Sequence, residues 1–169
     1  MSKKILIAYG SFSGSTAETA EFIGKKLSIK GMQADVKPVN KINSLEGYDG
    51  VIIGSAVVMG KIKSSVVKFV SANKGALSKV PVGYFLVCLT MQKDTPENRK
   101  IASGYLQPVS SVVKPVSEGL FPGKVDFKKL SFPMSLLILM PAFKKGVPEG
   151  DFRDWAKVEK WAGEMSSKF

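Results

Sequence analysis

Short hydrophobic runs alternate along the chain with stretches that have helical periodicity. The runs are rich in β-branched and aromatic residues and end in glycine or polar residues, which is typical of buried strands. We expect five strands, at Ile5–Tyr9, Gln33–Val39, Gly50–Gly54, Val82–Leu89 and Val116–Phe121. The third run is hydrophobic throughout, which indicates a strand that is covered on both faces.

Helical patterns occupy the intervals between these strands. A hydrophobic face extends from Ala17 to Leu27 before Gly31 ends the helix, and a second helix is expected at Ile62–Val70. Asp94–Glu97 predicts a further helix start, because an N-cap residue, a proline and an acidic residue follow one another there.

That third helix should reach Leu106, and Pro108 should bend or restart it before Val113. A last helix is expected after Asp151, with a hydrophobic stripe that should pack in the core. The stripe consists of Trp155, Val158, Trp161, Ala162 and Met165.

The alternation of strands and helices predicts an α/β fold in one domain, residues 1–169. Its sheet should be parallel and doubly wound, with right-handed crossovers and helices on both faces. Ligands of such sheets bind at the carboxyl ends of the strands. Three loops leave those ends here, at residues 10–16, 54–61 and 88–95.

Composition restricts the chemistry of the site. The 169 residues include no histidine and one cysteine, Cys88, which excludes an internal disulfide, Ser-His and Cys-His nucleophile pairs, and a multi-cysteine metal site. We expect no metal and interpret Cys88 as a small buried hydrophobic residue at the end of its strand. The net charge of +11 favours anionic partners. Nucleic acid is not expected among them, because no recognition motif or interleaving of aromatic and basic residues is present.

The loop between the first strand and the first helix is the most informative segment. Backbone N–H groups and a helix start can bind a phosphate there, and the hydroxyls of Ser11, Ser13, Ser15 and Thr16 can add hydrogen bonds. Gly14 allows a close approach or a positive φ. The dinucleotide and P-loop spacings are absent. An ordinary polar loop with an N-cap remains the alternative interpretation.

The Ser-x-Ser-Gly-x-Thr loop resembles the FMN phosphate loop of flavodoxins, and the likeness covers nearly the whole chain. Within that superfamily, the sequence is most similar to the flavodoxin-domain group that includes menaquinone-dependent protoporphyrinogen oxidase. The residues that carry this likeness are Gly54–Lys61, Thr95–Arg99 and Phe121–Lys124 through Glu149–Trp155. The resemblance implies a flavodoxin-like five-stranded sheet of order 2-1-3-4-5, with a hydrophobic insertion at about 124–150 after the fifth strand.

The resemblance also implies FMN as the cofactor and two sets of contacts to it. The phosphate would be bound by Ser11, Phe12, Ser13, Gly14, Ser15 and Thr16. The flavin ring would be bound by Ser55, Ala56, Val57, Val58, Met59 and Gly60, and by Cys88, Leu89, Thr90 and Met91. The second and third loops lack the aromatic residues with which many flavodoxins cover the ring. A flavin face without that cover could receive a flat substrate.

Two functions remain open at this point. The first is an FMN-binding oxidoreductase that is quinone-linked and acts on protoporphyrinogen or a related hydrophobic, anionic substrate. The second is a flavodoxin-type electron carrier that docks on redox partner proteins. No general acid or base and no other catalytic residue can be assigned from the sequence.

Four charged residues are candidate substrate contacts. Lys61 and Lys63 lie next to the second loop, where they could meet an anionic substrate, and Asp151 and Arg153 lie in a turn expected on the ligand side of the sheet. The alternatives are a solvated surface for the lysines, and helix capping with an exposed ion pair for the other two.

The segment 127–145 is strongly hydrophobic and is bracketed by lysine pairs. One interpretation is a peripheral membrane contact, with the lysines at anionic lipid headgroups. The other is a buried helix that covers the sheet edge or forms a homodimer contact. No hydrophobic run reaches the roughly 18 residues of a spanning helix, and no signal-peptide pattern is present. We therefore expect a cytoplasmic protein, which the first interpretation would place at the inner face of the membrane.

Overall fold

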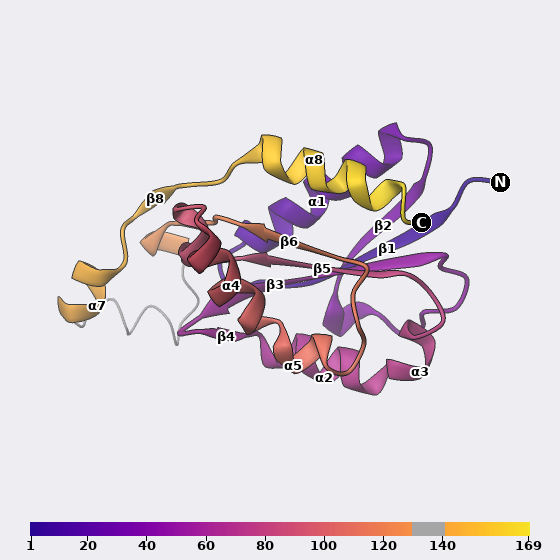
Figure 1. The fold of residues 1–169 in the computed structure, drawn as a ribbon, viewed down its shortest axis with the longest axis horizontal. Coiled ribbons are helices and arrows are strands. Elements are labelled where there is room, and N and C mark those ends of the chain that lie inside the picture. The colour runs from indigo at the N-terminus through magenta and orange to yellow at the C-terminus, as the bar shows by residue number, and fades with distance from the viewer. Residues whose placement is uncertain (130–140) are drawn as a thin grey trace.

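The computed structural model describes residues 1–129 and 141–169, and it contains a central parallel sheet (Figure 1). The order of its strands is β2-β1-β3-β5-β6, and every neighbouring pair is parallel. The strands are β1 (Lys4–Gly10), β2 (Gln33–Pro38), β3 (Gly50–Val58), β5 (Val82–Val87) and β6 (Ser117–Phe121). When the parallel strands alone are numbered, this order is 2-1-3-4-5, which confirms the predicted topology.

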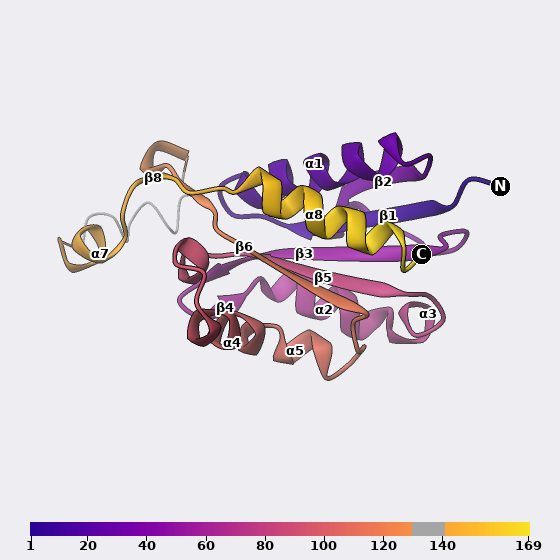
Figure 2. The same cartoon turned by 45° about the horizontal axis from the view of Figure 1, so that its top comes forward.

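Helices cover both faces of the sheet, as the alternating pattern predicted. Figures 1 and 2 show α1 and α8 on one face and α2, α3, α4 and α5 on the other. Their bounds are α1 (Ser15–Ile29), α2 (Ser64–Ala72), α3 (Lys74–Leu77), α4 (Pro96–Tyr105), α5 (Gln107–Ser110) and α8 (Trp155–Ser166).

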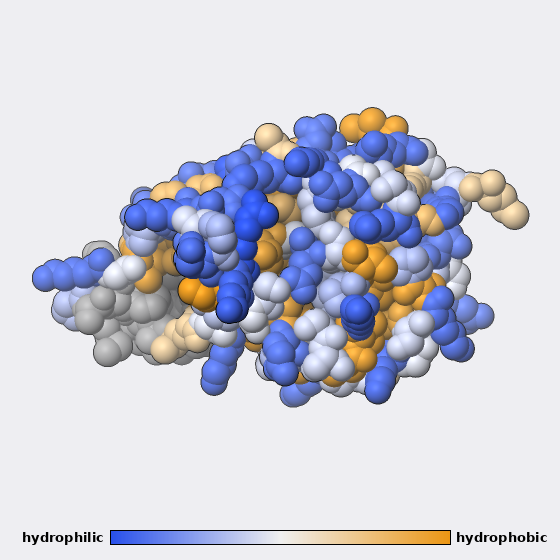
Figure 3. All heavy atoms as spheres, in the orientation of Figure 1, coloured by the Kyte–Doolittle hydropathy of each residue, from blue (hydrophilic) through white to orange (hydrophobic). Residues whose placement is uncertain are grey.

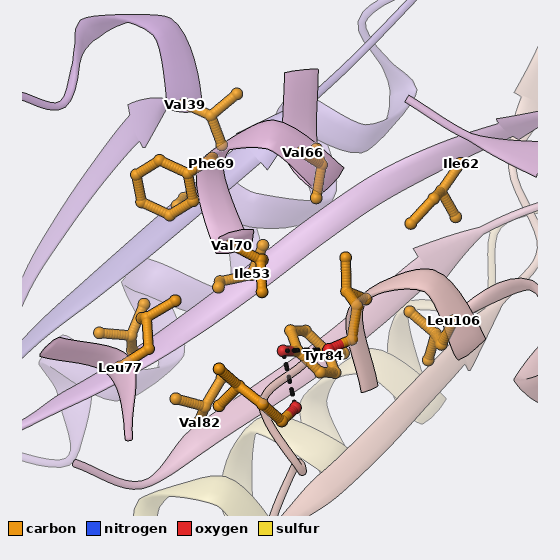
Figure 4. Close-up of a cluster of buried hydrophobic side chains, with 14 of the residues drawn as sticks. Val39, Ile53, Ile62, Val66, Phe69, Val70, Leu77, Val82, Tyr84 and Leu106 are labelled. Carbon is orange, nitrogen blue, oxygen red and sulfur yellow. Dashed lines mark hydrogen bonds between the residues drawn. The ribbon is translucent and has the colours of Figure 1, made fainter. Parts of the chain in front are cut away.

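The alternation of side chains along β1 divides the core between the two faces. Ile5 and Ile7 pack with α1 and α8, whereas Leu6 and Ala8 belong to the cluster on the opposite face. In that second cluster, the buried hydroxyl of Tyr84 donates to the carbonyl oxygens of Val113 at 2.9 Å and Val109 at 3.3 Å (Figure 4). Because β1 is buried on both faces, its successive positions must be hydrophobic, which explains the uninterrupted hydrophobic run in its sequence.

The expectation that the third strand ends at Gly54 was wrong. β3 continues to Val58 and turns back into β4 (Lys61–Ile62), with Val58 paired to Lys61. The connecting residues Met59 and Gly60 have φ values of 51° and 72°. A two-residue turn with both φ values positive matches the twist of an antiparallel hairpin. Within the loop predicted at residues 54–61, only Met59 and Gly60 therefore lie outside the strands.

Other boundaries moved for related reasons. α2 begins at Ser64 rather than Ile62, because Ile62 pairs with Val57 in the hairpin. β5 ends at Val87, and the next residues form the 3₁₀ turn η2 (Leu89–Gln92) rather than strand. Two helix starts were predicted correctly: the Thr95 hydroxyl accepts from the N–H of Asn98 at 3.1 Å, and α5 restarts the chain at Gln107.

The region expected as an insertion begins at the carboxyl edge of the sheet. It contains β7 (Lys124–Val125), the 3₁₀ turn η3 (Phe127–Lys129), α7 (Pro141–Gly146) and β8 (Gly150–Asp151). β7 and β8 form an antiparallel pair that the sequence did not predict. Residues 130–140, the centre of the predicted 127–145 segment, lie outside the described residues, so its membrane and homodimer interpretations stay predictions. Among the helices described, none is long and apolar enough to cross a membrane.

Candidate functional site

A cleft opens at the carboxyl ends of β1, β3 and β5, where the three predicted loops meet. Its walls are formed by the loop before α1, the β3–β4 hairpin, the end of β5 and the region around β7. The lining residues are Phe12, Ser13, Ser15, Thr16, Ala56, Val57, Val58, Met59, Val87, Cys88, Leu89, Gly123, Lys124, Val125, Phe127 and Val147.

The start of α1 faces this cleft without a side-chain cap. Gly14 occupies the N-cap position with φ 94°, and the first intrahelical bond runs from the N–H of Glu18 to the Gly14 carbonyl at 3.0 Å. The N–H groups of residues 15–17 precede that bond and so lack an intrahelical partner. Together with the positive end of the helix dipole, these donors can bind an anion.

The hydroxyl of Thr16 supports an anion at this position. The residue is 1% exposed, and its Oγ1 is buried without a hydrogen-bond partner in the described part of the chain. Leaving a buried hydroxyl unpaired costs about 1–3 kcal/mol. A ligand oxygen at the helix start would remove that cost, so the residues present fit the phosphate of a bound flavin nucleotide.

Two neighbouring hydroxyls hold the loop in its shape. Ser11 Oγ accepts from the N–H of Gly14 at 2.9 Å, and Ser15 Oγ accepts from the N–H of Lys124 at 3.1 Å. Each hydroxyl keeps its own hydrogen for a further acceptor. The loop is therefore preformed, and its serines remain available as donors.

The rest of the cleft is largely apolar. Ala56, Val57 and Val58 line it from β3, and Cys88 and Leu89 line it beyond the end of β5. Cys88 is 4% exposed, and burial raises the pKa of its thiol to about 11. The thiol is therefore protonated at neutral pH and acts as part of an apolar wall, as the sequence predicted. A flat heteroaromatic ring suits such a wall.

Among the described residues, two aromatic side chains border the cleft, although the second and third loops have none. Phe12 comes from the first loop and Phe127 from η3. Sequence reasoning missed Phe127, as well as Val147 and residues 123–125. These residues join the cleft through the β7–β8 pairing, and no local sequence signal marked that pairing.

Four of the residues predicted to contact the flavin ring have other neighbours among the described residues. Ser55 Oγ accepts from the backbone N–H of Lys63 at 3.0 Å, and Gly60 lies near the ring of Tyr105. The Thr90 hydroxyl lies 3.3 Å from the Tyr105 hydroxyl, and Met91 is buried beside Cys88. None of the four lines the cleft among the described residues, and their contact with a flavin stays a prediction.

The lysines next to the second loop differ in environment. Lys61 is exposed in β4. Lys63 turns toward the first loop, where its Nζ donates to the Ser11 carbonyl at 2.8 Å and lies 4.2 Å from the centroid of the Phe12 ring. Lys63 therefore contacts the loop at the helix start rather than open solvent.

Arg153 is held by two carboxylates. Its Nε and Nη2 donate to Asp151 at 2.8 and 2.6 Å, and its Nη1 pairs with Glu18 of α1. These contacts lower the pKa of Asp151, and hydrogen bonding to Asp151 and Glu18 raises the pKa of Arg153. Arg153 also lies over the ring of Trp155, 4.9 Å from its centroid. The cluster holds the segment before α8 against α1, and its contact with a substrate stays a prediction.

Hydrophilic side chains dominate the face shown in Figure 3, with smaller hydrophobic patches between them. The net charge of +11 makes the molecule as a whole attractive to anions. No group of three or more side chains suited to hold a metal ion occurs in residues 1–129 and 141–169.

Comparison with known sequences identifies relatives of this chain. The family model described as the flavodoxin domain matches residues 6–146. A protein of Escherichia coli K12 named protoporphyrinogen IX dehydrogenase (quinone) is 27% identical over 173 residues, covering 96% of this chain and 94% of that protein. A Leishmania major protein of the same name is 24% identical, covering 98% of this chain and 76% of the relative.

Solved structures share the fold at lower identity. Flavodoxin 2 from Bacillus cereus is 20% identical with a TM-score of 0.57, covering 98% of this chain and 99% of that chain. The rubredoxin oxygen:oxidoreductase of Desulfovibrio gigas is 14% identical with a TM-score of 0.57, over 97% of this chain. This chain spans 35% of that longer protein. From the family match over most of its length and the order of its sheet, we conclude that the chain belongs to the flavodoxin domain family, which implies that it binds a flavin.

Proposed function

We propose that the protein is an FMN-dependent oxidoreductase whose flavin domain comprises residues 1–169. The observation that carries this proposal is the buried hydroxyl of Thr16, which has no hydrogen-bond partner within residues 1–129 and 141–169, at a helix start without a side-chain cap from those residues and beside an apolar cleft. The phosphate of FMN would be bound by Ser11–Thr16. The flavin ring would lie against Ala56–Met59 and residues 88–89.

FMN, when bound, supplies the redox chemistry. The residues of this chain bind the cofactor, orient it and exclude water from the apolar wall. Neither a histidine nor an ionised thiol is available in the cleft to move a proton, because the chain has no histidine and Cys88 stays protonated. We therefore assign the protein a positioning role and name no general acid or base.

For the substrate, we propose a hydrophobic, anionic molecule such as a porphyrinogen, with a quinone as the acceptor. Each quinone would take up one pair of electrons and two protons and become a quinol, so the complete oxidation of a porphyrinogen to a porphyrin would consume several quinones in turn. The names of the Escherichia coli and Leishmania major relatives support this choice. The net positive charge supports it too, because it attracts carboxylates.

A flavodoxin-type electron carrier is the second candidate. It is favoured by Met59, a large hydrophobic side chain that lines the cleft at the tip of the β3–β4 hairpin and is nevertheless 79% exposed. An exposed hydrophobic residue at the rim of a cofactor cleft suits transient contact with a redox protein.

Two measurements test these proposals. Mass spectrometry of the material that heat releases from the purified protein should detect FMN. A protein that releases no FMN and also binds none when titrated with it would overturn both functions. The FMN-loaded, reduced protein is then mixed anaerobically with a menaquinone analogue, and in parallel the oxidised protein is mixed with protoporphyrinogen and that quinone. Rapid quinone reduction with appearance of porphyrin fluorescence supports the enzyme. Slow quinone reduction, with fast electron transfer to a redox protein such as cytochrome c, supports the carrier.

A further inference from the structure

Lys63 reaches the loop at the start of α1 from a different part of the chain. It is the N-cap residue of α2, and its backbone N–H donates to Ser55 Oγ at the end of the sheet. Its side chain passes Gly10, where a Cβ atom would lie 3.1 Å from Lys63 Cδ and 2.6 Å from Val66 Cγ2. The absence of a side chain at Gly10 therefore opens the path of the lysine stem toward Ser11.

The ammonium group is held by a carbonyl and a ring. It donates to the Ser11 carbonyl at 2.8 Å and lies 4.2 Å from the centroid of Phe12. Both partners are neutral, and Lys63 forms no salt bridge within residues 1–129 and 141–169. A half-buried ammonium without a carboxylate partner in the described residues, bonded to the loop that precedes the start of α1, is a site of uncompensated positive charge.

Two other lysines near the loop have acidic neighbours. Lys124 and Lys129 border a small hollow together with Glu18 and Asp126. Acidic side chains share that hollow with the lysines, and Glu18 also pairs with Arg153. Lys63 has no carboxylate partner within residues 1–129 and 141–169, so its charge acts on the Ser11–Phe12 part of the loop without a paired counter-charge.

We propose that Lys63 is a specificity-determining residue for the phosphorylated form of the flavin. Its ammonium holds the Ser11–Phe12 backbone in the binding conformation and stabilises the dianionic phosphate electrostatically. This inference rests on the proposed FMN function. It assigns to Lys63 a role in cofactor selection instead of the substrate contact expected from its sequence position.

The test compares FMN with riboflavin, which has the same ring system but no phosphate. Dissociation constants are measured by flavin fluorescence quenching for the wild type, Lys63→Met and Lys63→Arg, with Lys68→Met as the control. Lys68 is an exposed lysine on the same helix, α2. We expect Lys63→Met to weaken FMN binding about tenfold or more and to leave riboflavin binding nearly unchanged. Lys63→Arg should recover most of the FMN affinity, and Lys68→Met should behave as the wild type.

Ionic strength provides a second measurement on the wild type, which does not depend on the folding of any variant. Added salt should weaken FMN binding more than riboflavin binding, because screening acts on the phosphate charge. A Lys63→Met protein that keeps the wild-type ratio of FMN to riboflavin affinity overturns the inference. If that variant does not fold, equal salt dependence for the two flavins overturns it instead. A wild type that binds neither flavin would overturn the proposed function, which is a distinguishable result.

Discussion

Phe85 on β5 occupies the space directly over Gly54 on β3. The two residues are register partners in neighbouring strands, and a Cβ atom at position 54 would lie 2.0 Å from Phe85 Cζ. Phe85 is fully buried and also packs near Phe121 and Trp161, with ring centroids 6.4 and 6.3 Å away. The sheet beneath the cleft can therefore bring this aromatic cluster close only because position 54 has no side chain.

Gly54→Ala should destabilise the protein by about 3 kcal/mol or more, since the methyl group overlaps a ring that cannot move away. The matched control is Gly104→Ala in α4, where a Cβ atom meets nothing within 4 Å. That control should stabilise by about 0.5–1 kcal/mol, because alanine is the better helix former. Urea unfolding followed by circular dichroism measures both free energies. A Gly54→Ala protein as stable as the wild type would contradict the packing described here.

Thr16→Val should separate folding from cofactor binding. Without flavin, the variant should be about 1 kcal/mol more stable than the wild type, because an unpaired buried hydroxyl has been replaced by a methyl group. With FMN, the variant should bind about tenfold or more weakly, because a hydrogen bond to a charged phosphate is lost. Thermal unfolding without flavin measures the expected gain in stability, and flavin titration measures the expected loss of FMN affinity. Ser13→Ala is the control, since Ser13 is not fully buried and its loss should leave apo stability unchanged.

Met59→Gly should relieve the backbone strain at the hairpin turn. The φ of 51° at Met59 lies in the left-handed region, where a side chain costs about 1 kcal/mol relative to glycine. The variant should therefore gain up to about 1 kcal/mol in the free energy of unfolding. Met59→Ala keeps the strained φ and removes a side chain that is mostly in solvent, so it should match the wild type. Equal stabilisation by both changes would contradict the positive φ at position 59 as the source of the strain.

Asp94 should make folding sensitive to acid. Its carboxylate accepts from Arg99 at 2.5 and 2.8 Å and from Lys157 of α8, and these bonds hold its pKa well below the usual value. A lowered pKa in the folded state contributes stability above the unfolded pKa of about 3.9, and this contribution is lost as the pH falls through the folded value.

Asp94→Asn should therefore cost about 1 kcal/mol at pH 7, a figure that allows for solvent screening of these largely exposed partners. The cost should shrink steadily as the pH falls below about 4. Urea unfolding at several pH values measures the difference between variant and wild type. Glu97→Gln in the first turn of α4 is the control and should show a smaller effect. A cost for Asp94→Asn that does not change between pH 7 and pH 3 would refute the ion-pair explanation.

The contrast between correct and missed elements has a local cause. The start of α4 was predictable because Thr95 and Pro96 encode the N-cap and first turn in neighbouring residues. The β3–β4 hairpin was missed because its turn is Met59-Gly60, whereas the usual signal is Asn-Gly or Asp-Gly. The β7–β8 pair was missed because each strand has two residues, which is too short for any periodicity.

The sequence by itself determined the alternation of strands and helices, the two-sided burial of β3, and a hydroxyl-rich loop at the start of α1. These features depend on residues close together in the chain, because the spacing of hydrophobic residues predicts which face of a strand or helix is buried. Only the tertiary structure decided which distant groups meet that loop: Lys63 lies 52 positions from Ser11, and Arg153 lies 135 positions from Glu18. Such contacts depend on how the crossovers bring separate elements to one edge of the sheet. Local periodicity carries no information about which residues far apart in the sequence meet there.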